Sequence, residues 1–212
     1  DLVARSGFEA LAHALESYVS TMATDFTRGW SLQAIKLIFA NLEASYHGDR
    51  QARSRMHNAA TLAGMAYANA FLGIDHALAH TLGAAFAVPS GIGDAIALPH
   101  VIAFNARKPQ KLAIWPHYAV YRADSDYAEI ARTLGLGGRN NQEAIAALVA
   151  AVRDLAHAVG IKLRLRNYGV DKQEFEDRLH DLAVEAYGNQ NTVTNPVAPL
   201  IKQLEELMQA CY

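Results

Sequence analysis

The chain has 212 residues, a formal net charge of -2, 51% hydrophobic residues and 19% charged residues. This composition supplies enough apolar side chains for a sizeable core and excludes a disordered chain. The near-neutral charge does not favour a nucleic acid or an anionic membrane surface as a partner. The single cysteine, Cys211, excludes a disulfide framework and fits a reducing, cytoplasmic compartment.

No apolar run approaches the ~20 residues that a membrane-spanning helix needs. The first residues do not resemble a signal peptide, and the chain opens on Asp1 rather than on Met. We therefore expect the sequence to begin inside a longer protein.

Apolar residues recur at helical spacing in almost every segment. The first expected helix carries the stripe Phe8, Leu11, Ala12, Leu15, Tyr18 and Val19, and residues 6–9 fit a capping box at its start. Further helices are expected at about 25–46 and 50–71, around His76 and His80, through Asp94 and Ile102 after a break at 89–91, and then at 126–134, 142–159, 172–187 and 198–211. Residues 108–123, with two prolines, are expected to form an irregular loop, and 161–165 alternate as a brief strand would.

Neither a βαβ rhythm nor a glycine-rich phosphate-binding motif occurs, so a nucleotide site has no local support in this chain. The pattern predicts an all-α multi-helix bundle.

Two pairs of polar residues interrupt the apolar helices, each at a spacing of four residues. Glu9 and His13 form the first pair, and His76 and His80 form the second. Residues four apart lie on the same helical face, so each pair can direct two donor atoms at one point. Carboxylate oxygen and imidazole nitrogen suit iron and zinc, and facing helices with such pairs can form a metal site inside a bundle.

Each of these residues also has a purely structural interpretation. Glu9 fits the third helical position of the capping box, and a histidine in an apolar helix can be a hydrogen-bonded core residue. Asp75 is either a partner of His76 or a helix N-cap. The histidines with polar neighbours are expected at the surface: His47, His57, His117, His157 and His180.

Several motifs, in the same order, resemble the iron-containing (group III) alcohol dehydrogenases. Residues 7–20, GFEALAHALESYVS, resemble the metal-binding helix of that family, and residues 70–83, AFLGIDHALAHTLG, resemble its second signature. Residues 98–105 (LPHVIAFN), 127–131 (YAEIA) and 194–196 (TNP) continue the resemblance. Residues 44–73 and the loop before Tyr127 look most like the alcohol dehydrogenase part of bifunctional aldehyde-alcohol dehydrogenases.

The resemblance implies a helical, dehydroquinate synthase-like domain over residues 1–212, without the Rossmann-like N-terminal domain that binds NAD(P) in this family. It implies a divalent metal, iron or zinc, bound by Glu9, His13 and His76, with His80 lining the catalytic pocket. It also implies a small primary alcohol and its aldehyde as substrates and a homo-oligomeric enzyme. A fragment without the cofactor-binding half is expected to be inactive by itself.

Two positions depart from the family pattern. Glu9 stands where the family has aspartate, and Ser90 stands where the family has its fourth ligand, a histidine in a Pro-His-Gly turn. A serine hydroxyl is a poor ligand compared with imidazole. Metal occupancy is therefore open, and the alternative function is a catalytically degraded homologue whose helical domain serves packing or assembly.

Overall fold

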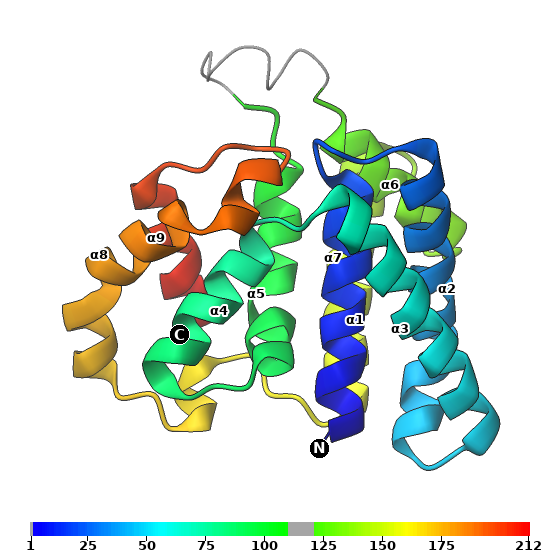
Figure 1. Cartoon of the computed structure of the whole chain (residues 1–212), viewed down its shortest axis with the longest axis horizontal. Coiled ribbons are helices and arrows are strands. Elements are labelled where there is room, and N and C mark those ends of the chain that lie inside the picture. The colour runs from blue at the N-terminus through cyan, green and yellow to red at the C-terminus, as the bar shows by residue number, and fades with distance from the viewer. Residues whose placement is uncertain (1, 110–120) are drawn as a thin grey trace.

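The computed structural model describes residues 2–109 and 121–212 (Figure 1). Within these residues the chain forms α-helices and short 3-10 helices and no strand, which confirms the predicted all-α fold. The elements in chain order are α1 (Leu2–Val19), α2 (Asp25–Tyr46), α3 (Arg50–Ala70), α4 (Ile74–Phe86), α5 (Ser90–Asn105), α6 (Ala123–Thr133), α7 (Asn141–Ala158), η1 (Leu165–Tyr168), α8 (Lys172–Gly188), η2 (Gln190–Thr194) and α9 (Ile201–Cys211).

Helix α1 lies at the centre of the bundle. Helices α2 and α3 pack against it on one side, and α5, with α4 packed on it, lies on the other (Figure 1). Helices α8 and α9 pack together and cover α4 and α5, while α7 contacts α5 and pairs with α6. Fully buried side chains of α1, such as Phe8, Leu11 and Leu15, join the core to Ile35 of α2 and Leu78 of α4. Burial of this apolar area is the main stabilising contribution.

The predicted capping box at residues 6–9 is wrong. Helix α1 begins at Leu2, so Ser6 lies inside the helix, where its hydroxyl donates to the Leu2 carbonyl at 2.9 Å. A serine inside a helix can donate its hydroxyl to the backbone carbonyl four residues earlier, so Ser6 does not act as a helix cap. Among the α-helices of the described residues, capping side chains are instead found at the starts of α2, α3, α7 and α8, namely Thr24, Asp49, Asn140 and Asp171.

The predicted strand at 161–165 is also wrong. Gly160 ends the preceding segment with a φ of +75°, and Leu165 already opens the 3-10 helix η1. Ile161 and Leu165 are buried, so the alternation reflects which side chains reach the core and not pairing with a second strand. Of the predicted loop at 108–123, residues 110–120 lie outside the described residues, and Ala123 opens α6.

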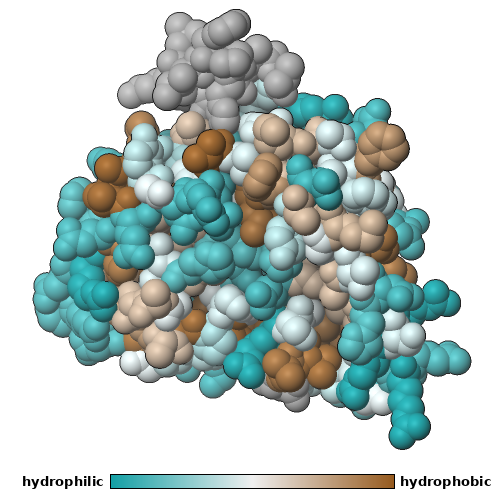
Figure 2. Space-filling view, viewed as in Figure 1, coloured by the Kyte–Doolittle hydropathy of each residue, from teal (hydrophilic) through white to brown (hydrophobic). Residues whose placement is uncertain are grey.

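No helix of the described residues is both long and apolar enough to cross a membrane. Hydrophobic residues on the face shown in Figure 2 lie in separate patches between hydrophilic ones. Among the large apolar side chains, Phe26 and Val193 are 78% and 73% exposed.

Gly91 fixes the approach of α5 to α1, because a Cβ atom at this position would overlap the backbone carbonyl of Arg5. We expect Gly91→Ala to lower the free energy of unfolding by roughly 1–3 kcal/mol, since neither backbone can move without disturbing the core. Gly64→Ala on α3 is the matched control: a Cβ there meets nothing within 4 Å, and removing a helical glycine should stabilise by about 0.5–1 kcal/mol. Urea unfolding of both variants tests the contrast, and equal effects would contradict the close contact.

Candidate metal centre

The structure places the two predicted pairs on facing helices, α1 and α4. The rings of His13 and His76 stack with their centroids 4.5 Å apart, and the His80 ring lies edge-on to His76 at 5.7 Å. Glu9 lies one turn before His13, and its carboxylate Oε2 accepts a hydrogen bond of 3.2 Å from the Ser90 hydroxyl. One region between α1, α4 and the start of α5 therefore holds the predicted ligands, His80, and Ser90, the residue that differs from the family pattern.

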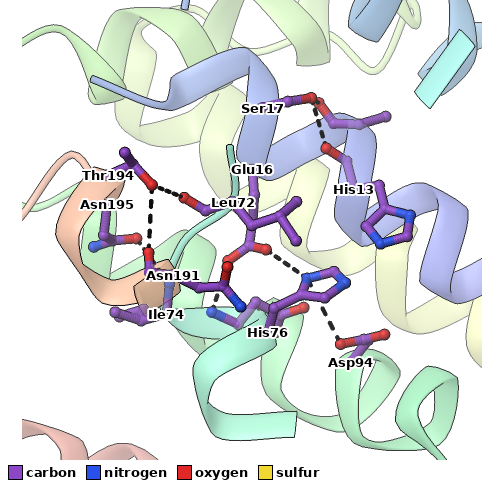
Figure 3. Close-up of polar contacts among 12 residues, drawn as sticks. His13, Glu16, Ser17, Leu72, Ile74, His76, Asp94, Asn191, Thr194 and Asn195 are labelled. Carbon is purple, nitrogen blue, oxygen red and sulfur yellow. Dashed lines mark hydrogen bonds and ion pairs between the residues drawn. The ribbon is translucent and has the colours of Figure 1, made fainter. Parts of the chain in front are cut away.

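His76 is held in place by Glu16 of α1 (Figure 3). The imidazole Nδ1 lies 2.6 Å from Oε2 of Glu16, and both side chains are 2% exposed. The second oxygen, Oε1, accepts the backbone N–H of Asp75 at 2.7 Å. Because a carboxylate only accepts hydrogen bonds, the proton lies on Nδ1, which leaves Nε2 as the lone-pair nitrogen when the ring is neutral. Nε2 is buried and has no hydrogen-bond partner among the described residues.

A second set of hydrogen bonds fixes the start of α4, and with it the position of His76. Asn195 accepts the Ile74 backbone N–H through Oδ1 at 3.2 Å, and its amide donates to Asn105 Oδ1 at 2.7 Å. The Thr194 hydroxyl donates to the Leu72 carbonyl at 2.7 Å (Figure 3). A Cβ at Gly73 would lie 2.8 Å from Glu16 Oε1, so glycine permits this close approach of chain and carboxylate. The family motif TNP thus contributes to positioning the helix that carries His76.

Burial and neighbouring charges give the three histidines different protonation states. Burial lowers the pKa of His76, but Asp94, Glu16 and Glu9 together raise it to about 9. Burial and the neighbouring His76 and His80 lower the pKa of His13 to about 3. The pKa of His80 is lowered by burial and by His76. At neutral pH His13 is therefore ready to act as a ligand, whereas a metal on His76 must displace a proton.

Three buried carboxyl groups lie near His76: Glu16 and Asp94 were not predicted as site residues, and Asp75 was predicted as either a partner of His76 or a helix N-cap. Glu16 lies seven residues after Glu9 and three after His13, so helical spacing alone places it on their face. Asp94 carries no local signal, since its position depends on how α5 packs beside α4. Asp75 is not the N-cap of α4, because that position is Gly73, so this alternative is wrong.

Ligand atoms of Glu16, Asp75 and His76 also lie within 4.8 Å of one another, an arrangement compatible with a metal ion. On the ring of His76 the nitrogen facing this group is Nδ1, which Glu16 already engages. The unpartnered Nε2 suits the predicted ligand set better, because a metal-binding imidazole commonly donates its other N–H to a carboxylate. Of the histidines predicted at the surface, His47, His57, His157 and His180 are exposed, and His117 lies outside the described residues.

The metal-free chain is expected to lose stability as the pH rises from about 6.5 to 9. The folded-state pKa of His76, about 9, exceeds the ordinary value of 6.5, so its contribution is complete below 6.5 and disappears as the pH passes 9. We expect the free energy of unfolding to fall by roughly 1–3 kcal/mol over this window. Urea unfolding with a chelator at pH 6.5, 8 and 9.5 measures it, and a flat or rising profile would contradict the assignment.

Comparison with known proteins places these features in a family. The model of the C-terminal part of the Fe-containing alcohol dehydrogenase family matches residues 3–212. An aldehyde-alcohol dehydrogenase of Streptococcus pneumoniae is 44% identical over 212 residues, which are 100% of this chain and 24% of that protein. An NADPH-dependent butanol dehydrogenase of Clostridium saccharobutylicum is 36% identical over 211 residues, 100% of this chain and 51% of that protein.

Among solved structures, an iron-containing alcohol dehydrogenase from Thermococcus thioreducens matches with a TM-score of 0.85 and 33% identity over 99% of this chain and 50% of that one. The chain thus spans about a quarter to a half of these relatives. The motifs of both signature helices, the all-α fold and the match over nearly the whole chain agree. The chain belongs to the Fe-containing alcohol dehydrogenase family, of which it represents the C-terminal helical part.

Proposed function

We propose that residues 1–212 are the metal-binding domain of an NAD(P)-dependent alcohol dehydrogenase that interconverts a small primary alcohol and its aldehyde. In this proposal Glu9, His13 and His76 hold a divalent iron or zinc ion. The nicotinamide cofactor is bound mainly by a nucleotide-binding half outside these residues, and the active enzyme is a homo-oligomer. The observation that carries the proposal is the buried, unpartnered Nε2 of His76, held beside His13 by the contact of Nδ1 with Glu16.

The residues present fit a divalent metal ion. His13 is kept neutral by burial. The ring of Tyr67 stacks on the imidazole of His13 with the centroids 4.3 Å apart, which restrains the imidazole. Glu9 adds a negative charge that stabilises a cation between the two helices. A metal ion held here would supply Lewis acidity to the oxygen of the bound alcohol or aldehyde.

His80 lines the substrate side of this arrangement. Its side chain is exposed at the end of the run of buried residues in α4, and its lowered pKa keeps the imidazole neutral at pH 7. A neutral imidazole nitrogen of His80 is able to accept the proton that an alcohol releases on oxidation and to return it in the reverse direction. The edge-on contact with His76 limits the orientations of the His80 ring.

The alternative function, a degraded homologue with a structural or assembly role, is favoured by one observation. The Ser90 hydroxyl donates to Glu9 Oε2 at the position where the family pattern has a fourth ligand. A neutral hydroxyl there engages the ligand carboxylate without adding a strong donor to the metal.

Metal content of the purified chain distinguishes the two functions. We expect near-stoichiometric iron or zinc after loading and dialysis, with His13→Ala and Glu9→Gln each reducing the retained metal. The exposed His57→Ala on α3 is the matched control and should retain the wild-type amount. Less than about a tenth of an equivalent in the wild-type chain would exclude the metal-enzyme function and leave the degraded homologue.

A further inference from the structure

The inner side of His76 faces an unusual group of buried acids. Glu16 is 2% exposed, and Asp75 and Asp94 are 0% exposed, although they come from three different helices. Both oxygens of Glu16 are used, by His76 and by the Asp75 backbone. In contrast, all four carboxyl oxygens of Asp75 and Asp94 are buried without a hydrogen-bond partner among the described residues.

Neither aspartate has a Lys or Arg ion-pair partner in the part of the chain that the structure describes. The nearest cationic group to Asp94 is His76, whose Nδ1 lies 3.9 Å from Oδ1 (Figure 3). This single imidazole is shared with Glu16 at 2.6 Å. Three carboxyl groups thus face one cationic side chain, and an unpaired buried carboxylate costs several kcal/mol.

Protons alone do not satisfy these groups. A protonated carboxyl carries an O–H that needs an acceptor, and burying it without one is still unfavourable. A cation would compensate the charge of these carboxyl groups; ligand oxygens of Glu16 and Asp75 already lie within 4.8 Å of each other, and Asp94 Oδ1 lies 3.9 Å from His76 Nδ1. Oxygen donors of this kind select small hard ions such as Mg²⁺ and Mn²⁺.

We propose that Asp75 and Asp94, with Glu16, form a second cation site on the Nδ1 side of His76, and that this site takes a small hard divalent ion. The site is separate from the one proposed above, which uses Nε2 on the opposite edge of the ring. Its ligands come from α1, α4 and α5, so the ion would join α5 to the two helices that carry Glu9, His13 and His76. This inference does not depend on the proposed dehydrogenase function.

The test is Mn²⁺ binding to the chelator-treated chain, followed by the electron paramagnetic resonance signal of free Mn²⁺. The variant Glu9→Gln serves as the background, because it weakens the site formed by Glu9, His13 and His76 and leaves the acids Glu16, Asp75 and Asp94 intact. We expect this variant to bind about one equivalent of Mn²⁺. Adding Asp94→Asn or Asp75→Asn should weaken that binding at least roughly tenfold, whereas adding Asp154→Asn, an exposed acid on α7, should leave it unchanged.

Circular dichroism and the thermal midpoint show that each variant is folded, and an Mn²⁺-dependent rise of the midpoint should accompany binding. The inference is overturned if the Glu9→Gln chain binds no Mn²⁺, or if it binds Mn²⁺ equally with and without Asp94 and Asp75. The proposed function fails separately, when the wild-type chain retains no iron or zinc while Mn²⁺ binding still depends on the two aspartates.

Discussion

Ser90→His is expected to tighten the binding of Zn²⁺ or Fe²⁺ by this chain by at least roughly tenfold, the lower end of what a full ligand contributes. The Ser90 hydroxyl already lies 3.2 Å from Glu9 Oε2, so a side chain at this position begins beside the ligand carboxylate. Ser90 is half-buried at the start of α5, so a larger side chain at this position is not enclosed on every side by the core. Replacing a neutral hydroxyl with imidazole nitrogen adds a ligand of the type that both ions prefer.

Competition with a chromophoric chelator measures the affinity of the wild-type chain and of the variant. Ser54→His, an exposed serine of α3, controls for the general effect of an added histidine and should leave the affinity unchanged. An equal affinity of wild-type and Ser90→His chains, with both folded, would mean that position 90 does not face the metal. The assignment of Ser90 to the family's fourth ligand would then be wrong.

The helices were predictable where local periodicity and tertiary packing agree. The stripe of Phe8, Leu11 and Leu15 is buried, as its spacing predicts. The start of α1 was mispredicted because Ser6 is of a residue type common at helix N-caps, but it lies one turn inside the helix. The alternation at 161–165 was misleading because a short segment can alternate in burial without a partner strand.

The candidate site was predictable only in part. The four-residue spacing predicted that Glu9 lies beside His13 and that His76 lies beside His80. The family resemblance predicted that residues of both pairs form one metal site. The facing of α1 and α4, which stacks His13 on His76, depends on long-range packing that no local pattern encodes. The same is true of Asp94, whose carboxyl reaches His76 from a third helix. Glu16 was accessible to sequence reasoning through its helical face, but its role depends on burial, which the spacing does not specify.

Replacing Glu16 is expected to have the largest effect on both metal affinity and stability. In Glu16→Gln the side chain keeps its shape and can still accept the Asp75 N–H, but the charge that orients and polarises His76 is lost. Loss of such a carboxylate partner typically weakens metal binding 10–100-fold. The pKa of His76 should also fall, because Glu16 is one of the groups that raise it.

Glu16→Ala should in addition lower the free energy of unfolding by roughly 3–5 kcal/mol, since it breaks a buried pair and leaves His76 without its partner. The chain offers a matched control: His180 and Glu205 form a similar contact of 2.7 Å, but the histidine side chain is 72% exposed. Solvent screens that pair, so Glu205→Ala should cost less than about 1 kcal/mol. Urea unfolding of both variants, and a pH titration of His76 by NMR in Glu16→Gln, measure these effects. Equal losses of unfolding free energy in Glu16→Ala and Glu205→Ala, or an unchanged His76 pKa in Glu16→Gln, would mean that Glu16 does not hold His76. The unpartnered Nε2 would then no longer support His76 as a metal ligand.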